Sequence, residues 1–302
     1  MKTTNWAKRN RGAALLLSLW ALFLLSAMLI SWALEIDSRL SLSGSANRIL
    51  EAEAMACSGA EVALHPHVKP DSANLIHQEG RQSFEAHISG EGGRLNLNWL
   101  VAGEDPARLE ILRKYLELKG IDLNERDHMI DCLLDWVDPD NLVRLNGAED
   151  ADDYHPANSL LTRIDQLKKV KGWEEFTATP GWDNDLTLNS SGPIDLTWAS
   201  REVLLALPGM TEPVVDAFLQ LRRGLDGIDG TKDDNHFKSL EEVRAVIGFS
   251  PEQSAALNGL VEFKDQIFRI VSVGKSGDIT RVVQMVVRKV GNSPQMITWR
   301  EL

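Results

Sequence analysis

The stretch KRNRGAALLLSLWALFLLSAMLISWALE (Lys8–Glu35) decides how the rest of the chain is organised. Its basic residues end at Arg11, a glycine follows at Gly12, and the next charged residue is Glu35. As a helix, the uncharged run of about 22 residues would span about 33 Å, which is enough to cross the hydrocarbon core of a bilayer. The basic residues before this run predict a cytoplasmic N-terminus, with the rest of the chain on the other side of the membrane.

Three alternative interpretations of this apolar run are open. A cleaved secretion signal has a shorter apolar region, about 7–15 residues, and a small-x-small cleavage site, which does not stand cleanly at the end of this run. A permanent single-pass anchor agrees with the length and the basic flank. The third interpretation comes from Arg11-Gly12, which resembles the leader of type IV prepilins that is cut on the cytoplasmic side. That resemblance implies cleavage after Gly12 by a prepilin peptidase, methylation of the new N-terminus at Ala13, and retention of the helix.

The helical pattern continues beyond the apolar run. Apolar residues recur near helical spacing until Pro66 and Pro70 end the pattern. We therefore expect one helix of roughly 80 Å, apolar all round in its first half and carrying a single apolar stripe in its second half. The stripe is imperfect because Glu53 occupies one of its positions. The expected stripe consists of Ile36, Leu40, Ala46, Ile49, Leu50, Ala56, Cys57, Ala60, Ala63 and Leu64.

Strand patterns lie on both sides of a long helical segment. Apolar and polar residues alternate over Phe84–Ile88 and again over Leu95–Trp99, with a glycine-rich turn between them. Near the C-terminus, two β-rich runs, Ile267–Val273 and Ile279–Val290, are joined by the hairpin signal Gly-Lys-Ser-Gly-Asp, and the final QMITWREL can add a strand. We therefore expect one sheet whose strands come from two distant parts of the sequence.

The segment between the strands is mostly helical. Amphipathic patterns predict helices over Pro106–Gly120 and Asn124–Asp138, with Asn124 as the N-cap of the second. TRIDQLKKVKGW and TWASREVLLALPG predict two short helices. The simplest fold is α+β, with a long N-terminal helix on an antiparallel sheet that a helical insertion divides. The expected segments are 1–12 as a leader, 13–34 and 35–66 as the two halves of the helix, 75–100 as the first part of the sheet, 101–262 as the insertion and 263–302 as the C-terminal strands.

The stretch DWVDPDNLVRLNGAEDADDYH (Asp135–His155) concentrates carboxylates in a loop that contains Pro139 and Gly147. Carboxylates at this density repel one another unless solvent or a cation screens them, and Ca²⁺ takes about six to eight oxygen ligands from flexible loops. The spacing is not that of an EF-hand, and a solvated acidic loop is the alternative. The acidic residues of the stretch are Asp135, Asp138, Asp140, Glu149, Asp150, Asp152 and Asp153.

These features together resemble one family of secretion proteins. Most pilins carry a glutamate at the fifth position after the leader, where this chain has Leu17. The missing glutamate, the divided sheet and the signature DWVDPD…NGAEDADDY are similar to the K-type minor pseudopilins of type II secretion, the general secretion pathway protein K family. The resemblance implies a type IV pilin-like fold with a large inserted α-helical domain. It also implies bound calcium, with Asp138, Asp140, Glu149, Asp150 and Asp152 or Asp153 as ligands.

The function that the resemblance implies is structural. Such a subunit would lie at the tip of the periplasmic pseudopilus of a Gram-negative bacterium, anchored in the inner membrane by a single span with a cytoplasmic N-terminus. It would initiate or cap pseudopilus assembly for the export of folded proteins across the outer membrane. The implied partners are the I- and J-type minor pseudopilins, the major pseudopilin, the prepilin peptidase and the inner-membrane assembly platform. The alternatives are a minor tip pilin of a type IV pilus and a calcium-binding single-pass envelope protein without a fibre.

The remaining patterns concern other functions. Leu207–Thr211 and the helix after it resemble a helix-hairpin-helix unit, but the net charge of −12 argues against nucleic-acid binding, so an architectural hairpin is expected. No GxSxG, HExxH, CxxC or phosphate-loop motif is present, so no enzyme is expected. Cys57 and Cys132 can form a disulfide outside the inner membrane or remain two separate thiols. A second acidic loop, GLDGIDGTKDDNHF, is expected to be a glycine-rich turn.

Overall fold

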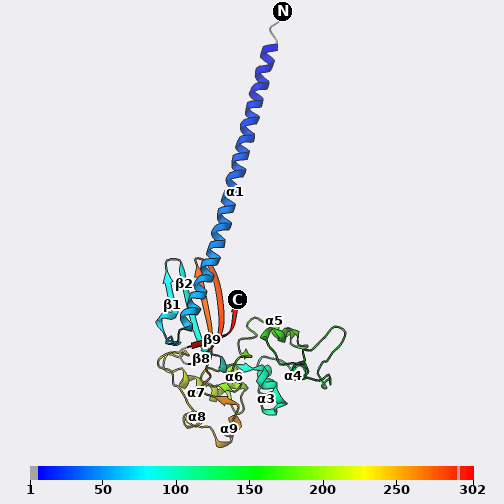
Figure 1. Cartoon of the computed structure of the whole chain (residues 1–302), viewed down its shortest axis with the longest axis vertical. Helices are drawn as coiled ribbons and strands as arrows, with labels where there is room; N and C mark the ends of the chain where they lie inside the picture. The colour runs from blue at the N-terminus through cyan, green and yellow to red at the C-terminus, as the bar shows by residue number, and fades with distance from the viewer. Residues whose placement is uncertain (1–5, 291–292) are drawn as a thin grey trace, which may run out of the picture.

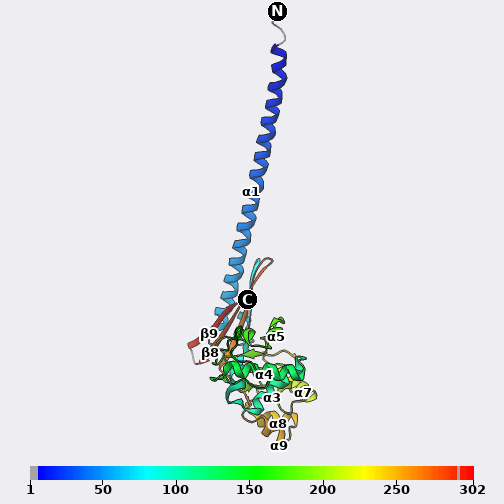
Figure 2. The ribbon, with the colours of Figure 1, turned by 90° about the vertical axis from the view of Figure 1, so that its right-hand side faces the viewer.

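A single long helix dominates the shape of the molecule (Figures 1 and 2). The computed structural model describes residues 6–290 and 293–302, and helix α1 runs without a break from Trp6 to Leu64. The helix ends where the sequence predicts, because Pro66 lacks a backbone N–H and disfavours helical geometry in the residue before it. Within the described residues, α1 is the one helix that is long and apolar enough to cross a membrane.

The first half of α1 stands clear of the rest of the chain (Figure 1). From Leu15 to Leu34, its large apolar side chains expose between 56% and 75% of their surface. The most apolar window of the helix has a mean hydropathy of 2.5. Such a surface is stable in a bilayer or against other apolar helices, since exposing it to water is unfavourable.

A five-stranded antiparallel sheet packs on the second half of α1 (Figure 1). The strand order β1-β2-β7-β8-β9 joins two strands that precede the helical domain to three that follow it. Strand β2 pairs with β7, so that Ile88 lies opposite Ile270 and Gly90 opposite Phe268. The predicted division of the sheet between two distant segments is therefore confirmed. The strands are β1 (Ile76–Glu79), β2 (Gln82–Gly90), β7 (Ile267–Ser276), β8 (Ile279–Val290) and β9 (Ser293–Glu301).

Small side chains bring α1 very close to the sheet. A Cβ atom added at Gly274 of β7 would lie 2.1 Å from the carbonyl oxygen of Ala52 and 2.2 Å from the backbone nitrogen of Ala56. A Cβ atom at Gly59 of α1 would lie 2.3 Å from the hydroxyl of Ser272. No larger side chain fits at these positions, so helix and strand are in direct backbone contact. The fully buried alanines on this face are Ala52, Ala56, Ala60 and Ala63.

The predicted apolar stripe of α1 is only partly correct. Its later alanines are buried as expected, but Leu40 and Leu50 expose 67% and 62% of their surface. Ala52 and Gly59 lie in the contact and were not predicted. A search for large apolar side chains misses them, because a close helix–strand approach requires small residues instead.

Residues 91–266 form a helical domain at the end of the molecule opposite to the N-terminus (Figures 1 and 2). Its hydrophobic core is separate from the one between α1 and the sheet, and it includes the large buried side chains of Tyr115, Trp173 and Phe218. The helices are α2 (Leu97–Val101), α3 (Pro106–Leu118), α4 (Leu123–Val137), α5 (Glu174–Ala178), α6 (Arg201–Ala206), α7 (Glu212–Arg222), α8 (Leu240–Ile247) and α9 (Pro251–Leu257). The domain also contains the short strands β3 (Leu95–Asn96), β4 (Leu186–Thr187), β5 (Ile194–Asp195) and β6 (Val261–Glu262). Its 3₁₀ turns are η2 (Glu91–Gly93), η3 (Ala102–Glu104) and η4 (Ile164–Lys169), and η1 (Ala73–Leu75) precedes β1.

The strand predicted over Leu95–Trp99 is wrong. Strand β3 ends at Asn96, whose side chain accepts a hydrogen bond of 3.2 Å from the backbone N–H of Trp99 and so caps α2. Leu95, Leu97 and Leu100 all belong to the core of the helical domain. The chain therefore passes from the sheet to the helical domain after Gly90, not at residue 100 as expected, and it returns to the sheet at β7.

The other helices of the domain follow the predicted pattern with local differences. Helix α4 is capped by Asp122, which accepts hydrogen bonds from the backbone of Asn124 and Glu125, so the prediction of Asn124 as the cap is wrong. The segment predicted as a short helix near residue 164 is the 3₁₀ turn η4. The predicted hairpin is confirmed, because Leu207 to Thr211 connect α6 and α7, and the side chains of Leu207 and Met210 are buried.

A buried ion pair joins the helical domain to the sheet. The guanidinium of Arg269 on β7 donates two hydrogen bonds of 2.8 Å to the carboxylate of Glu91, which is fully buried at the start of the domain. The hydroxyl of Thr187 on β4 also donates to Glu91. Burial, together with the nearby charge of Arg269, lowers the pKa of Arg94 to about 10. Glu91 is thus held between two arginines, and removing it would leave buried positive charge without compensation.

Candidate metal-binding site

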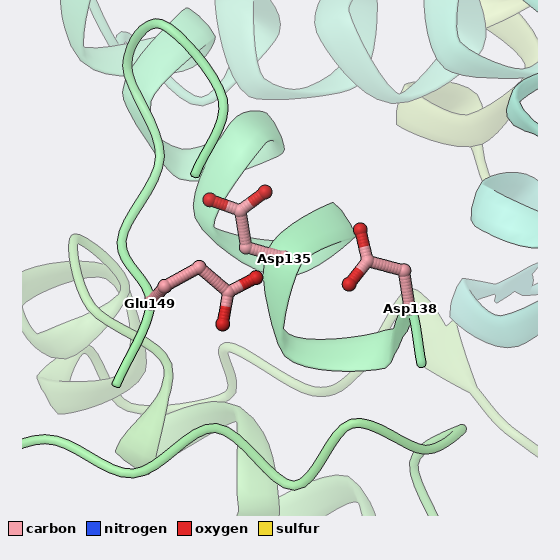
Figure 3. Close-up of side chains that lie close together, drawn as sticks. All are labelled: Asp135, Asp138 and Glu149. Atoms are coloured by element: carbon pink, nitrogen blue, oxygen red, sulfur yellow. The ribbon is translucent and has the colours of Figure 1, made fainter. Parts of the chain in front are cut away.

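Three acidic side chains converge at the C-terminal end of α4 (Figure 3). Asp135 lies in the last turn of the helix, Asp138 directly follows its last residue, and Glu149 reaches toward them from the loop that returns past the helix. Three residues of separation place Asp135 and Asp138 on the same side of the helix end. One carboxylate oxygen from each of the three residues lies within 4.8 Å of the others.

Arg144 crosses this acidic group. Its guanidinium donates hydrogen bonds to Asp135 at 2.5 Å and to Asp138, and it also reaches Glu104 at 2.7 Å. Asp135 exposes none of its surface, so its charge requires a partner of opposite sign. One arginine neutralises only one of the three negative charges in the group of Asp135, Asp138 and Glu149.

Several oxygens of the group have no hydrogen-bond partner within the described part of the chain. Both carboxylate oxygens of Glu149 and one of Asp138 are buried and unpartnered. Burial raises the pKa of Glu149, and the neighbouring charges of Asp135 and Asp138 raise it further. A buried carboxylate without a partner is costly, and a hard cation with oxygen ligands would supply the missing interaction. The residues present therefore fit Ca²⁺.

A glycine allows the loop to pass directly against the acidic group. A Cβ atom at Gly147 would lie 1.9 Å from a carboxylate oxygen of Asp135, so a larger residue would displace that carboxylate. The preceding residue, Asn146, donates hydrogen bonds from its backbone and its side chain to Asp131 of α4, at 3.1 and 3.0 Å. These contacts position the part of the loop that leads to Glu149.

The structure brings together two of the predicted ligands and adds a third. Asp138 and Glu149 belong to the group, and Asp135 joins them although it was not predicted as a ligand. The signal for Asp135 was its spacing of three residues from Asp138 at the end of a predicted helix. The structure does not bring the other predicted ligands, Asp140, Asp150, Asp152 and Asp153, into this group.

The other predicted ligands have different surroundings. Asp140 accepts a hydrogen bond of 2.8 Å from the backbone of Leu142 in a local turn. Asp150 lies 2.5 Å from the imidazole of His155. Asp152 and Asp153 are exposed to solvent in the following turn.

The second acidic loop is fully hydrogen-bonded by its own chain. Asp226, Asp233 and Asp234 also approach one another, but each accepts backbone hydrogen bonds within the loop. The hydroxyl of Thr231 and these backbone donors lower the pKa of Asp233 to about 2. Because its exposed carboxylates have partners, this loop behaves as the expected glycine-rich turn.

The sequence left two alternatives open for the cysteines, a disulfide and two separate thiols. Both thiols are free in this structure. Cys57 packs beside the core between α1 and the sheet, whereas Cys132 is fully buried in the core of the helical domain. Burial raises the pKa of the Cys132 thiol to about 12, so this group is uncharged and unreactive at neutral pH. The alternative of two separate thiols describes the structure.

Comparisons with known proteins converge on one family. Residues 93–179, which contain all three residues of the acidic group, match the family described as type II secretion system (T2SS), protein K. A stretch of 71 residues is 31% identical to the type II secretion system protein K of Dickeya chrysanthemi, and it covers 23% of this chain and 20% of that relative. The matched stretch therefore spans about a fifth of the length of this relative.

The fold comparison covers far more of the chain. The fold of this protein resembles that of a chain in the crystal structure of the GspK-GspI-GspJ complex from the type 2 secretion system of enterotoxigenic Escherichia coli, with a TM-score of 0.57 and 14% sequence identity. The match covers 88% of this chain and 97% of that chain. At this identity, the likeness concerns the fold: a long helix, an antiparallel sheet and an inserted helical domain.

Proposed function

We propose that this chain, whose residues 93–179 belong to the type II secretion system protein K family, is a minor pseudopilin at the tip of the secretion pseudopilus. The observation that carries this proposal is the similarity of nearly the whole chain to one fold, in which a wide domain lies at the far end of a long apolar helix (Figure 1). A domain this wide would obstruct a subunit stacked above it. Its position therefore suits the end of a fibre.

The bare half of α1 supports the role of anchor and fibre core. Before assembly, its exposed apolar surface would lie in the inner membrane, with the helical domain in the periplasm. A prepilin peptidase would cut after Gly12 and leave Ala13 as the methylated N-terminus. The structure describes the backbone at this cleavage site as part of α1. Leu17 provides no carboxylate for the N-terminus of another subunit, which suits a subunit that begins the fibre.

Apolar side chains are also exposed on α1 just before and beside the sheet. Leu40, Leu42 and Leu50 expose 67%, 68% and 62% of their surface. Exposed apolar residues along a helix favour packing against other helices. We infer that they contact the helices of I- and J-type minor pseudopilins, since the related E. coli chain is part of a GspK-GspI-GspJ complex. The major pseudopilin and the inner-membrane assembly platform would engage the same fibre.

We further infer that Asp135, Asp138 and Glu149 hold a calcium ion. The supporting observation is the buried, unpartnered carboxylate of Glu149 beside two other acidic groups. When bound, the ion would supply positive charge and tie the loop of Glu149 to the end of α4. Its role would be structural, because it would join the loop of Glu149 to the end of α4.

Co-purification tests the proposed function. The full-length chain, tagged and co-expressed with the I- and J-type minor pseudopilins of the same organism, should retain both partners in detergent. Leu40→Arg should reduce recovery of the partners at least about tenfold, since it places a charge in an apolar helix contact. Leu225→Arg is the matched control, because Leu225 is fully exposed on the helical domain, away from α1. Failure to retain either partner would contradict the proposal.

A further inference from the structure

Arg144 occupies both oxygens of Asp135, one of which a cation in the acidic group would need. Its guanidinium donates to one oxygen of Asp135 and one of Asp138, and its backbone N–H donates to the second oxygen of Asp135 at 3.2 Å. A cation ligated by Asp135, Asp138 and Glu149 requires at least one free oxygen from each residue. One oxygen of Asp138 and both oxygens of Glu149 are free, but both oxygens of Asp135 already accept hydrogen bonds from Arg144, so a cation that binds Asp135 must displace or weaken one of these contacts.

We propose that Arg144 competes with a divalent cation for Asp135, and that Arg144 thereby sets the cation affinity and couples cation binding to the position of its own loop. This inference rests on the proposed calcium site, and it identifies Arg144 as the residue that regulates calcium binding there. A guanidinium is permanently charged and matches carboxylates in geometry. The guanidinium of Arg144 thus takes the place of a bound cation, and a calcium ion must displace it.

The loop that carries Arg144 is held largely by these polar contacts. Leu142, Val143 and Leu145 expose 76%, 62% and 97% of their surface, so apolar packing does not fix this part of the loop. Anchoring resumes at Asn146 through its hydrogen bonds to α4. On the other side, hydrogen bonds from Asn158 hold Asp140 and Asn141. Release of Arg144 would therefore free residues 142–145 while leaving the flanking residues in place.

The released segment would move three exposed apolar side chains on the surface of the helical domain. Exposed apolar groups of this kind favour contact with other proteins. Cation binding would therefore change the contact surface of the domain, and not only its stability. The change would be local, because the core of the domain includes none of these three side chains.

Calcium titration of the full-length chain in detergent tests the competition. Arg144→Gln should tighten calcium binding by about tenfold or more, because it removes a like charge within a few ångströms of the ion. Arg144→Lys should have an intermediate effect, since it keeps the charge but loses the two-pronged contact. Arg113→Gln is the control and should leave the affinity unchanged, because Arg113 pairs with Glu110 and Asp127, outside the acidic group.

Hydrogen–deuterium exchange tests the movement of the loop without relying on a variant. Calcium should increase deuterium uptake in the peptide around residues 141–145 of the unmodified chain, since the N–H of Arg144 would lose its acceptor. In Arg144→Gln, uptake there should be high with and without calcium. If Arg144→Gln does not fold, as judged by circular dichroism, the exchange of the unmodified chain and the Arg144→Lys titration decide the matter.

The outcomes separate this inference from the calcium site itself. Calcium binding by the unmodified chain, combined with weaker or equal binding by Arg144→Gln, would overturn the competition and leave the calcium site in place. Reduced uptake in the loop on adding calcium would also overturn it, because Arg144 would then remain bound beside the ion. No calcium binding by either chain would overturn the calcium site and the inference together.

Discussion

Replacing Glu91 by glutamine would break the ion pair that joins the helical domain to the sheet. Glu91 exposes none of its surface and Arg269 exposes 8%, so the guanidinium would remain buried without its anion. Removing one partner of a buried ion pair costs about 3–5 kcal/mol. For a chain of this size, that loss corresponds to a fall in Tm of roughly 6–20 °C. Arg94 adds to the cost, because its guanidinium lies 3.4 Å from the same carboxylate and would lose this partner as well.

The assay is thermal unfolding of the full-length chain in detergent, followed by circular dichroism. Replacing both Glu91 and Arg269 by methionine should cost less than Glu91→Gln alone, because Arg269 would no longer be buried without its anion and only Arg94 would lose its partner. Glu110→Gln is the control, since it removes an exposed ion pair with Arg113 and should cost less than about 1 kcal/mol. A fall of less than about 2 °C for Glu91→Gln, or a double variant less stable than the single one, would refute the reasoning.

Three further predictions follow from the geometry. Gly274→Ala should destabilise the chain by about 1–3 kcal/mol in chemical unfolding, because the added Cβ would meet the backbone of α1. The control Gly44→Ala should be neutral or slightly stabilising, since a Cβ there meets nothing within 4 Å. Equal effects of the two variants would contradict the close contact between α1 and β7. In calcium-free buffer, burial and neighbouring carboxylates raise the pKa of Glu149 above 4.5, so the folded chain binds this proton more tightly than the unfolded chain. The resulting stability is present at low pH and is lost as the pH rises through the raised pKa, and Glu149→Gln should remove this part of the pH dependence. Gly12→Ala should leave the leader attached, seen as slower migration in gels, whereas mass spectrometry of the unmodified protein should find methylated Ala13; an uncut unmodified protein would contradict the prepilin leader.

The large elements of the fold could be predicted because their signals are local and strong. Pro66 ends α1 by its own backbone chemistry, and the alternation of Phe84, Ala86 and Ile88 marks the buried face of β2. The alternation over Leu95–Trp99 was misleading, because the side chain of Asn96 caps a helix there. Alternation alone does not distinguish a strand from residues that enter a helical core at a turn.

Predicting the acidic group was harder because its geometry depends on how a loop returns to a helix. The sequence identified the correct stretch, yet only Asp138 and Glu149 of the predicted ligands meet. Asp140 instead turns onto its own backbone, which short acidic side chains often do in loops. Asp135 could have been selected by its helical spacing from Asp138, but the contact with Arg144 depends on a loop conformation that no local pattern specifies.

The position of the insertion explains how a pilin-like sheet can accommodate so large a domain. The chain leaves the sheet after Gly90 and returns near Phe268, and these two residues lie opposite each other in the pairing of β2 with β7. The helical domain therefore occupies the place of a hairpin loop between adjacent antiparallel strands, where the cost of closing a longer loop grows only slowly with its length. No strand pairing has to be broken to admit it. A hairpin of this kind does not by itself fix the orientation of the inserted domain. The pairing of Glu91, the first residue of the domain, with Arg269 helps to fix it, as does the pairing of Arg300 on β9 with Asp183.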